Sequence, residues 1–312
     1  MMTSKLLKTA LTSSVVLSLA ATGCVKQDAP PDEIQRAIPT ADQVQIKLPN
    51  NTARTLGQLA NYYVVTRDVT RTLNGGTAWV LILIHAIVQQ PVTSISGNVY
   101  TWGPGSQALD PADYKLDVTD NGDGTYDYVL SGKSKTIANA QFEAIIEGHA
   151  DPRPGELQGN GDFSVDFDAS KRVNPVDSGD AKGKVIVQYD LAARHLDMHA
   201  EAPDANGQPA SFDYAYNEMV TGGGDMVFNV TANGGGTALA ENMVIRSRWL
   251  ADGSGRGDAR LAGGDLGTAQ AIASECWSSL FRRTFYGDNV SWQPTEGSES
   301  ACAFATADLP AL

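Results

Sequence analysis

Basic residues are scarce in this chain. Its 312 residues include 23 Lys and Arg against 36 Asp and Glu, which gives a formal net charge of −13 at pH 7. A surface of that sign repels the phosphates of nucleic acids and the headgroups of anionic lipids. The composition therefore excludes nucleic acid as a partner, and it excludes membrane attachment through a basic patch.

Long hydrophobic runs are also missing beyond Cys24. The longest extends from Trp79 to Val88, and it includes His85. A membrane-spanning helix needs about 20 predominantly apolar residues, roughly twice as many as this run offers. We therefore expect the run to be a buried core element, with His85 as a hydrogen-bonded core histidine.

The start of the chain, up to Cys24, has the pattern of an export signal. Lys5 and Lys8 make the start positive, a mostly apolar stretch extends from Ala10 to Ala21, and Ala21-Thr22-Gly23 precedes Cys24. Export signals share this order, and an ordinary signal peptide that contains a cysteine is one interpretation. Small residues directly before a cysteine also resemble the lipobox of bacterial lipoproteins, although Ala21 stands where that family usually has Leu.

The lipoprotein resemblance implies a position in the cell. In that family the chain is cut before the cysteine, so residues 1–23 are the signal peptide and the mature chain begins at Cys24. The sulfur of Cys24 receives diacylglycerol, and two or three acyl chains such as palmitate hold the protein on the membrane. More than one chain is needed because each buried CH₂ contributes only about 0.8 kcal/mol. Val25 stands where an inner-membrane retention signal would place Asp, which favours the outer membrane of the bacterial envelope.

Cysteine is rare in the rest of the chain, where only Cys276 and Cys302 remain. Two cysteines in an exported chain predict one disulfide, which contributes about 3 kcal/mol by closing the loop between them. A metal-binding pair or a redox pair is the alternative. No CxxC motif supports either one, and the four histidines all lie far from both cysteines in sequence: His85, His149, His195 and His199.

Two regions follow the signal. Residues 24–50 are polar and contain four prolines, which predicts a tether between the lipid and the folded body. The alternation of Val44, Ile46 and Leu48 predicts a short strand near its end. We expect residues 51–312 to form a single β-rich domain.

Helices are expected near residues 56–90 of that domain. Leu56 to Leu73 follows the spacing of one helical face. Asn74-Gly75-Gly76 should end this helix, because glycine supplies the backbone freedom that helix ends use. Ala78 to Gln90 then forms a second helix, for which a buried strand is the alternative.

From Asn98 onward the pattern is β. Apolar and polar side chains alternate, so each strand should bury one face and expose the other. Turns rich in Gly, Asp and Asn between short strands indicate an antiparallel meander. The apolar positions are Tyr114, Leu116 and Val118; Tyr126, Tyr128 and Leu130; Phe163, Val165 and Phe167; Val185, Val187 and Tyr189; Phe212, Tyr214 and Tyr216; and Met226, Phe228 and Val230.

A degenerate repeat of glycine followed by a polar residue runs through this region. The repeats begin at Gly161, Gly183, Gly224 and Gly257. The intervals between them are too uneven for a solenoid, whose repeats share one fixed period. We expect recurring hairpin geometry instead.

The sharpest candidate for chemistry is the segment from His195 to His199. On a strand, His195, Asp197 and His199 share one face, and neighbours about 7 Å apart could bind one metal together. The two histidines, about 13 Å apart, are too far from each other for a single zinc ion. Leu196 and Met198 supply a buried side, so a solvated strand face is the interpretation that we adopt. We predict no metal site and no cofactor.

Other motifs are weaker. A group of acidic and amide residues resembles a calcium loop but lacks the closing Glu, which favours a hairpin turn: Asp117, Asp120, Asn121, Asp123 and Asp127. Arg256-Gly257-Asp258 spells an adhesion tripeptide, and we expect it to start a strand. No G-x-S-x-G elbow and no acid–base constellation is present, so we do not predict an enzyme.

The C-terminal quarter resembles a set of uncharacterised bacterial lipoproteins, and the resemblance implies no activity. It is carried by Ser247-Arg248-Trp249, residues 253–258, Gly263-Gly264-Asp265 and Glu275-Cys276-Trp277.

The predicted fold is mainly β: a large curved antiparallel meander sheet, half-barrel or barrel-like, with one or two N-terminal helices on its apolar face. At the fold level this resembles the half-barrel carriers of the bacterial envelope, an analogy that says little about function. Two functions stay open. One is binding of an apolar ligand or acyl chain between sheet and helices; the other is a structural or protein-interaction role with a filled core. A continuous apolar cavity would favour the first.

Overall fold

The computed structural model describes residues 32–48, 59–106, 109–153, 155, 158–176, 181–203, 207–232 and 239–309. The export signal and Cys24 lie outside the described residues, so their predicted roles stay predictions.

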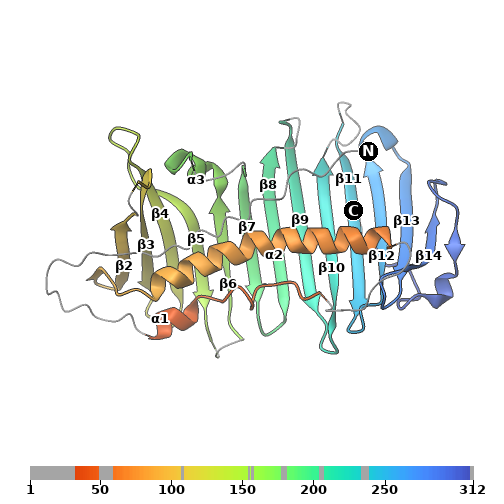
Figure 1. The fold of residues 1–312 in the computed structure, drawn as a ribbon, viewed down its shortest axis with the longest axis horizontal. Helices are drawn as coiled ribbons and strands as arrows, with labels where there is room; N and C mark the ends of the chain where they lie inside the picture. The colour runs from red at the N-terminus through yellow and green to blue at the C-terminus, as the bar shows by residue number, and fades with distance from the viewer. Residues whose placement is uncertain are drawn as a thin grey trace.

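One antiparallel sheet forms the body of the molecule (Figure 1). Its strands pair in chain order from first to last, which confirms the predicted meander. The sheet is open, with β1 and β15 as its edge strands, so it does not close on itself. The strands are β1 Ser94–Ser96, β2 Val99–Gly105, β3 Ala112–Asp120, β4 Tyr126–Ser134, β5 Glu143–Asp151, β6 Asn160–Asp166, β7 Lys184–Asp190, β8 His195–Pro203, β9 Pro209–Glu218, β10 Gly223–Ala232, β11 Glu241–Leu250, β12 Gly255–Gly263, β13 Gln270–Trp277, β14 Arg283–Asp288 and β15 Glu296–Gly297.

The six predicted alternating stretches are strands β3, β4, β6, β7, β9 and β10. One boundary differs, because Phe167 begins helix α3 (Phe167–Val173) instead of ending β6. The cause is local. The carboxylate of Asp166 accepts a hydrogen bond from the backbone N–H of Ala169 at 2.7 Å, which caps a new helix.

A single long helix, α2 (Asn61–Val88), runs across the strands (Figure 1). Its 28 residues span about 42 Å. The predicted helix end at Asn74-Gly75-Gly76 is therefore wrong. The side chain of Asn74 forms two hydrogen bonds of 2.9 Å with the backbone N–H and C=O of Ile46. Such tertiary contacts outweigh the low helix propensity of this tripeptide.

Residues 32–48 pack on the body, although their composition predicts part of a free tether. Helix α1 (Asp32–Ala37) buries Ile34, and the amide of Gln35 donates to the carbonyl of Val88 at 3.3 Å. Val44 and Ile46 are buried without forming the expected strand. The imidazole Nε2 of His85 lies 3.1 Å from the carbonyl oxygen of Pro39, so His85 is hydrogen-bonded as expected.

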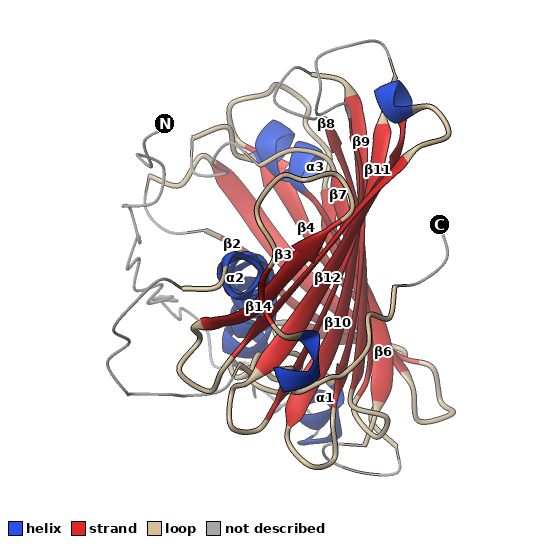
Figure 2. Cartoon of the chain, turned by 90° about the vertical axis from the view of Figure 1, so that its right-hand side faces the viewer, coloured by secondary structure: helices blue, strands red, loops and turns tan. Residues whose placement is uncertain are grey.

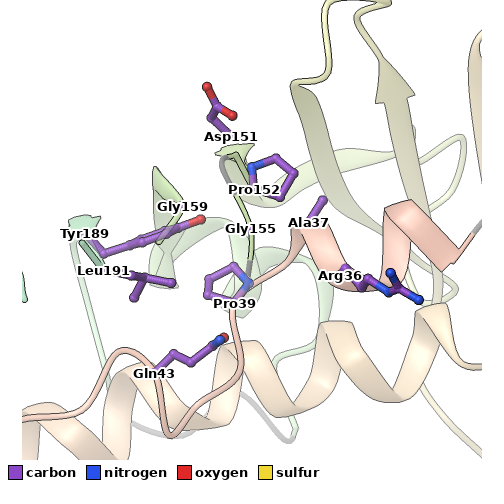
Figure 3. Close-up of a pocket in the computed structure, with 10 residues that line it drawn as sticks. All are labelled: Arg36, Ala37, Pro39, Gln43, Asp151, Pro152, Gly155, Gly159, Tyr189 and Leu191. Carbon is purple, nitrogen blue, oxygen red and sulfur yellow. The ribbon is translucent and has the colours of Figure 1, made fainter. Parts of the chain in front are cut away.

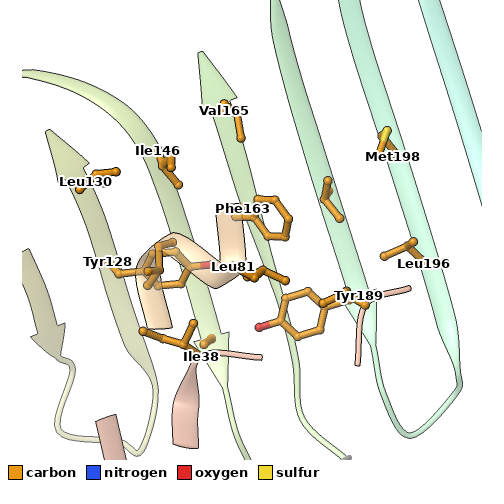
Figure 4. Close-up of a cluster of buried hydrophobic side chains, with 14 of the residues drawn as sticks. Ile38, Leu81, Tyr128, Leu130, Ile146, Phe163, Val165, Tyr189, Leu196 and Met198 are labelled. Carbon is orange, nitrogen blue, oxygen red and sulfur yellow. The ribbon is translucent and has the colours of Figure 1, made fainter. Parts of the chain in front are cut away.

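The core lies between α2 and the face of the sheet that contacts it, which we call the inner face. Leu81, Ile84 and Val88 of α2 are fully buried. Figure 4 shows Leu81 and Ile38 among the inner-face rings of Tyr128, Phe163 and Tyr189. The apolar run therefore does cover the sheet, but Ile82 points away from it with 60% of its surface exposed.

Glycines on the inner face lie directly opposite aromatic residues. The cross-strand pairs are Gly148 with Tyr128, Gly161 with Tyr189, Gly224 with Trp249 and Gly255 with Trp277. A Cβ atom on any of these glycines would lie 2.2–2.4 Å from the partner's side chain. The rings therefore lie over the glycines, an arrangement that also supports a strand weakened by glycine.

This arrangement corrects our interpretation of the glycine repeat. Gly161 and Gly224 make room for a ring within a strand, and a Cβ on Gly257 would lie 2.7 Å from that of Tyr62 on α2. Only Gly183, with φ +81°, has the backbone of a turn. The repeat therefore marks inner-face positions more often than hairpins.

Candidate interaction surface

The opposite side of the sheet, which we call the outer face, is polar across many strands. Asp127, His149, Asp162, Gln188 and Asp197 are successive Cα partners from β4 to β8. These side chains alternate with the buried inner-face residues, so they form one continuous row. The carboxylate of Asp127 is 52% exposed and that of Asp197 is 45% exposed. Water reaches this part of the outer face.

Three histidines on the outer face each contact a carboxylate. The distances are 2.6 Å from His149 Nδ1 to Asp127 Oδ1, 2.7 Å from His195 Nε2 to Asp197 Oδ2, and 2.6 Å from His199 Nδ1 to Asp213 Oδ1. Sequence spacing alone misses Asp127 and Asp213, which reach their histidines from neighbouring strands.

The predicted face of β8 is confirmed. His195, Asp197 and His199 lie on the outer face, while Leu196 and Met198 are buried on the inner face. Within the described ranges, no group of three or more His, Cys, Asp or Glu side chains is arranged to hold a metal ion. The segment is a solvated strand face with two histidine–carboxylate pairs.

Carboxylate neighbours change the titration of two of these rings. Hydrogen bonds to Asp213 and then to Glu201 raise the pKa of His199 above its ordinary 6.5. For His195, burial lowers the pKa, but hydrogen bonds to Asp197 and Asn217 raise it by more. The cause is that only a protonated imidazole can donate from both nitrogens. This surface therefore gains positive charge near neutral pH more readily than free histidine would.

The other half of the outer face is covered by residues 298–309, which we call the strap. The strap begins with a 3₁₀ helix, η2 (Glu299–Ala301), and is joined to β13 by a disulfide between Cys276 and Cys302. The sulfurs are 2.07 Å apart and the Cα atoms 5.6 Å apart, which confirms the predicted pairing. Figure 2 shows α2 on one side of the sheet and the strap on the other.

Beneath the strap lies a charged cluster that the sequence analysis did not identify. The side chains of Arg256 and Asp258 are both fully buried, with Arg256 Nε 2.8 Å from Asp258 Oδ1. The tripeptide that they form with Gly257 lies inside β12, so it is closed to an adhesion receptor. One sequence signal was the alternation of Arg246 and Arg248 with Ser247 and Trp249, which places two guanidinium groups on one face.

The resemblance to a calcium loop ends in a hairpin, as predicted. Between β3 and β4, the backbone N–H of Asn121 donates to the carbonyl of Thr125. Asp120 and Asp123 accept hydrogen bonds from the backbone N–H groups of Gly122 and Thr125 at 2.8 and 3.0 Å. The hydrogen bonds from Thr125 also lower the pKa of Asp123. These two carboxylates therefore stabilise the turn by accepting hydrogen bonds from its backbone.

A small pocket opens between the N-terminal segment and the ends of β5 to β7 (Figure 3). The cavity volume is about 20 Å³, far below the range of about 300–1,000 Å³ usual for small-molecule sites. Arg153 holds Asp151 through two hydrogen bonds of 2.8 Å and lowers the pKa of that carboxyl to about 2. With Arg36, Gln43 and Asp151 in its lining, the pocket does not suit an acyl chain.

None of the helices in the described part of the chain combines the length and hydrophobicity needed to cross a membrane. Comparison with protein families, curated proteins and solved structures finds no match to this chain.

Proposed function

We propose that this chain is a lipoprotein of the bacterial envelope, anchored through Cys24 in the outer membrane, that acts by binding another protein. The observation that carries the proposal is the filled interface between α2 and the sheet. A carrier of acyl chains needs a continuous apolar cavity between its sheet and its helices. Here, wherever the structure describes the side chains of α2, the protein's own side chains occupy this space.

Direct contacts support a filled interface along the helix. Near its N-terminus, Thr66 Oγ1 lies 2.6 Å from Ser247 Oγ of β11, and both residues are buried. Toward its C-terminus, Leu81 and Ile84 are fully buried. Burial raises the pKa of the Tyr128 and Tyr214 hydroxyls well above the ordinary 10, as expected where water is excluded. This geometry favours the interaction role over ligand carriage.

The exposed outer face from β4 to β9 supplies the surface for a partner. Its carboxylates include Asp127, Asp162, Asp197 and Asp213, and the whole chain is acidic. Electrostatic complementarity between surfaces speeds association and selects partners. The partner that fits this face is a protein with a basic surface.

Cross-linking from defined positions tests the proposal. A photoreactive benzoylphenylalanine replaces Asp162 on the outer face in intact cells, and the matched control replaces Ile82, which is exposed on α2. We expect one basic protein to be captured from position 162 and not from position 82. The captured protein, once purified, should bind Asp162→Asn/Asp197→Asn at least about tenfold more weakly than the parent.

Three results would argue against this function: no capture from position 162, capture of a neutral or acidic protein, or equal capture from position 82. Equal affinity for the parent and the double variant would show that the outer-face carboxylates do not contact the partner.

A further inference from the structure

The strap contacts three arginines of the outer face through its carboxylates. Glu299 Oε1 lies 2.6 Å from Arg256 Nη2, and Asp308 Oδ2 lies 2.7 Å from Arg246 Nη1. The same Asp308 carboxylate is 3.9 Å from Arg248 Nη1. Arginine–carboxylate contacts are among the strong, geometrically specific hydrogen bonds of proteins. The strap thus places two anionic groups, one near each of its ends, on one arginine cluster.

The backbone of the strap adds contacts of a kind that any peptide could make. The carbonyl of Phe304 accepts from Arg256 Nη1 at 3.2 Å, and the carbonyl of Thr306 accepts from Arg248 Nη2 at 2.8 Å. The guanidinium of Arg248 also lies 4.9 Å from the centre of the Phe304 ring. Residues 304, 306 and 308 alternate, as in an extended chain. The strap therefore lies on the arginines like a bound acidic peptide.

The arginines keep partners of their own within the sheet. Arg246 Nη2 is 2.7 Å from Asp225, and Asp258 lies 2.8 Å from Arg256 Nε and 3.3 Å from Arg248 Nη2. Three guanidinium groups thus share two carboxylates, which leaves one positive charge for an incoming anion. Departure of the strap would strip no arginine of its last carboxylate, so it avoids the large cost of an unpaired buried charge.

Apolar burial contributes little to holding the strap in place. Residues 303 and 305–308 are exposed, and Phe304 is only partly buried. Cys302 fixes the strap to Cys276, whose side chain is fully buried in β13. A segment tethered in this way competes at an effective concentration in the millimolar range. With the disulfide closed, the strap can therefore keep other acidic segments out.

We propose that Arg246, Arg248 and Arg256 form a binding site for an extended acidic segment of a partner protein, and that the strap occupies this site in the same chain. The arginine site would bind an acidic segment, whereas the outer face of β4–β9 is proposed to bind a basic protein. The two proposals are therefore independent. Opening the Cys276–Cys302 disulfide frees the strap from β13 and leaves it joined to the sheet only through β15. A dithiol supplies two electrons and two protons, its own sulfurs form a disulfide, and both cysteines become thiols.

A binding measurement with the full-length chain tests the site. The probe is a fluorescent peptide of residues 298–309 carrying Cys302→Ser. The recipient is the full chain with Glu299→Gln, Cys302→Ser and Asp308→Asn, in which the resident strap has lost its disulfide and the two carboxylates that contact the arginines, and is joined to the sheet only through β15. We expect the recipient to bind the probe at least about tenfold more tightly than the parent, with affinity that falls as salt rises. Dithiothreitol should raise the affinity of the parent for the probe toward that of the recipient.

Matched changes locate the binding. Adding Arg248→Gln to the recipient should weaken binding of the probe at least about tenfold. Arg260→Gln, on the outer face of the neighbouring strand β12, should leave the affinity unchanged. A probe that also carries Glu299→Gln and Asp308→Asn should bind poorly, a test that stands even where an arginine variant fails to fold. Equal affinity of parent and recipient, indifference to Arg248→Gln, or indifference to the probe's carboxylates would overturn the site.

Discussion

The carboxylate of Glu275 on β13 accepts a hydrogen bond from the backbone N–H of Tyr62, in the first turn of α2, at 2.5 Å. Glu275 is fully buried, and its other oxygen lies 2.5 Å from Nε of Arg283. A carboxylate at this end of a helix satisfies a free N–H and meets the positive end of the helix dipole. Ala60, which precedes α2, has no side chain that could cap the helix. Glu275 therefore supplies the capping carboxylate from the sheet.

Replacing this carboxylate should therefore loosen the helix from the sheet. Glu275→Gln leaves the buried guanidinium of Arg283 without its closest anion, and we expect a loss of about 3 kcal/mol in the free energy of unfolding. Glu296→Gln is the matched control, because Glu296 lies 3.5 Å from Arg283 and is 56% exposed. It should cost less than about 1 kcal/mol. Urea denaturation of both variants measures the difference, and equal losses would contradict the role assigned to Glu275.

The helix surface supplies a second matched pair, Ile84 and Ile82. Ile84 is fully buried on the sheet, and Ile82 is 60% exposed. Ile84→Ala should lower the free energy of unfolding by about 2–5 kcal/mol, because it leaves a cavity in the core. Ile82→Ala should change it by less than about 0.5 kcal/mol. A large loss at Ile82, or none at Ile84, would mean that α2 meets the sheet through another face.

The pairing of His199 with Asp213 predicts a dependence of stability on pH. Because the pKa of His199 is raised in the folded protein, its stabilising contribution is complete below about pH 6.5. That contribution is lost as the pH rises through the higher, folded-state pKa. The difference in unfolding free energy between the parent and His199→Gln should therefore shrink from pH 6 to pH 8.5. A second variant, Asp213→Asn, should show the same trend, and a difference that stays constant with pH would refute the linkage.

The predicted anchor has a direct test in cells. Cys24→Ala should abolish labelling by a palmitate analogue and release the protein from the outer membrane, because no other acyl acceptor is predicted. Cys302→Ser is the control and should keep both properties. Labelling that persists in Cys24→Ala would mean that the segment ending at Cys24 is an ordinary signal peptide or serves another purpose.

Alternation of apolar residues was sufficient to predict six strands of the sheet and its antiparallel meander. Tyr126, Tyr128 and Leu130 share the inner face because side chains on a strand alternate by geometry alone. The continuity of α2 could not be predicted in this way. Asn74 is held by the backbone of Ile46, a contact between residues 28 positions apart that local propensity does not contain.

The charged cluster under the strap shows a different limit. Arg256 and Asp258 are charged residues in a strand, which normally indicates a solvated face. The C-terminal segment reaches both of them: Arg256 donates to Glu299 and to the carbonyl of Phe304, and Asp258 accepts from the backbone N–H of Asp308 at 3.4 Å. The sequence predicted the disulfide that brings this segment back, but not the strands on which it would lie.

Side chains of the protein itself fill the space between α2 and the sheet at every position of α2 whose side chain the structure describes. The most direct measurement is organic extraction of the protein purified from the cells that produce it, followed by mass spectrometry of the extract. A thioether-linked anchor, as proposed at Cys24, would stay on the protein during extraction, so only non-covalent ligands are counted. We predict no apolar molecule in stoichiometric amount. An acyl chain or lipid recovered at about one per protein would contradict this account and would indicate that the protein carries an apolar ligand.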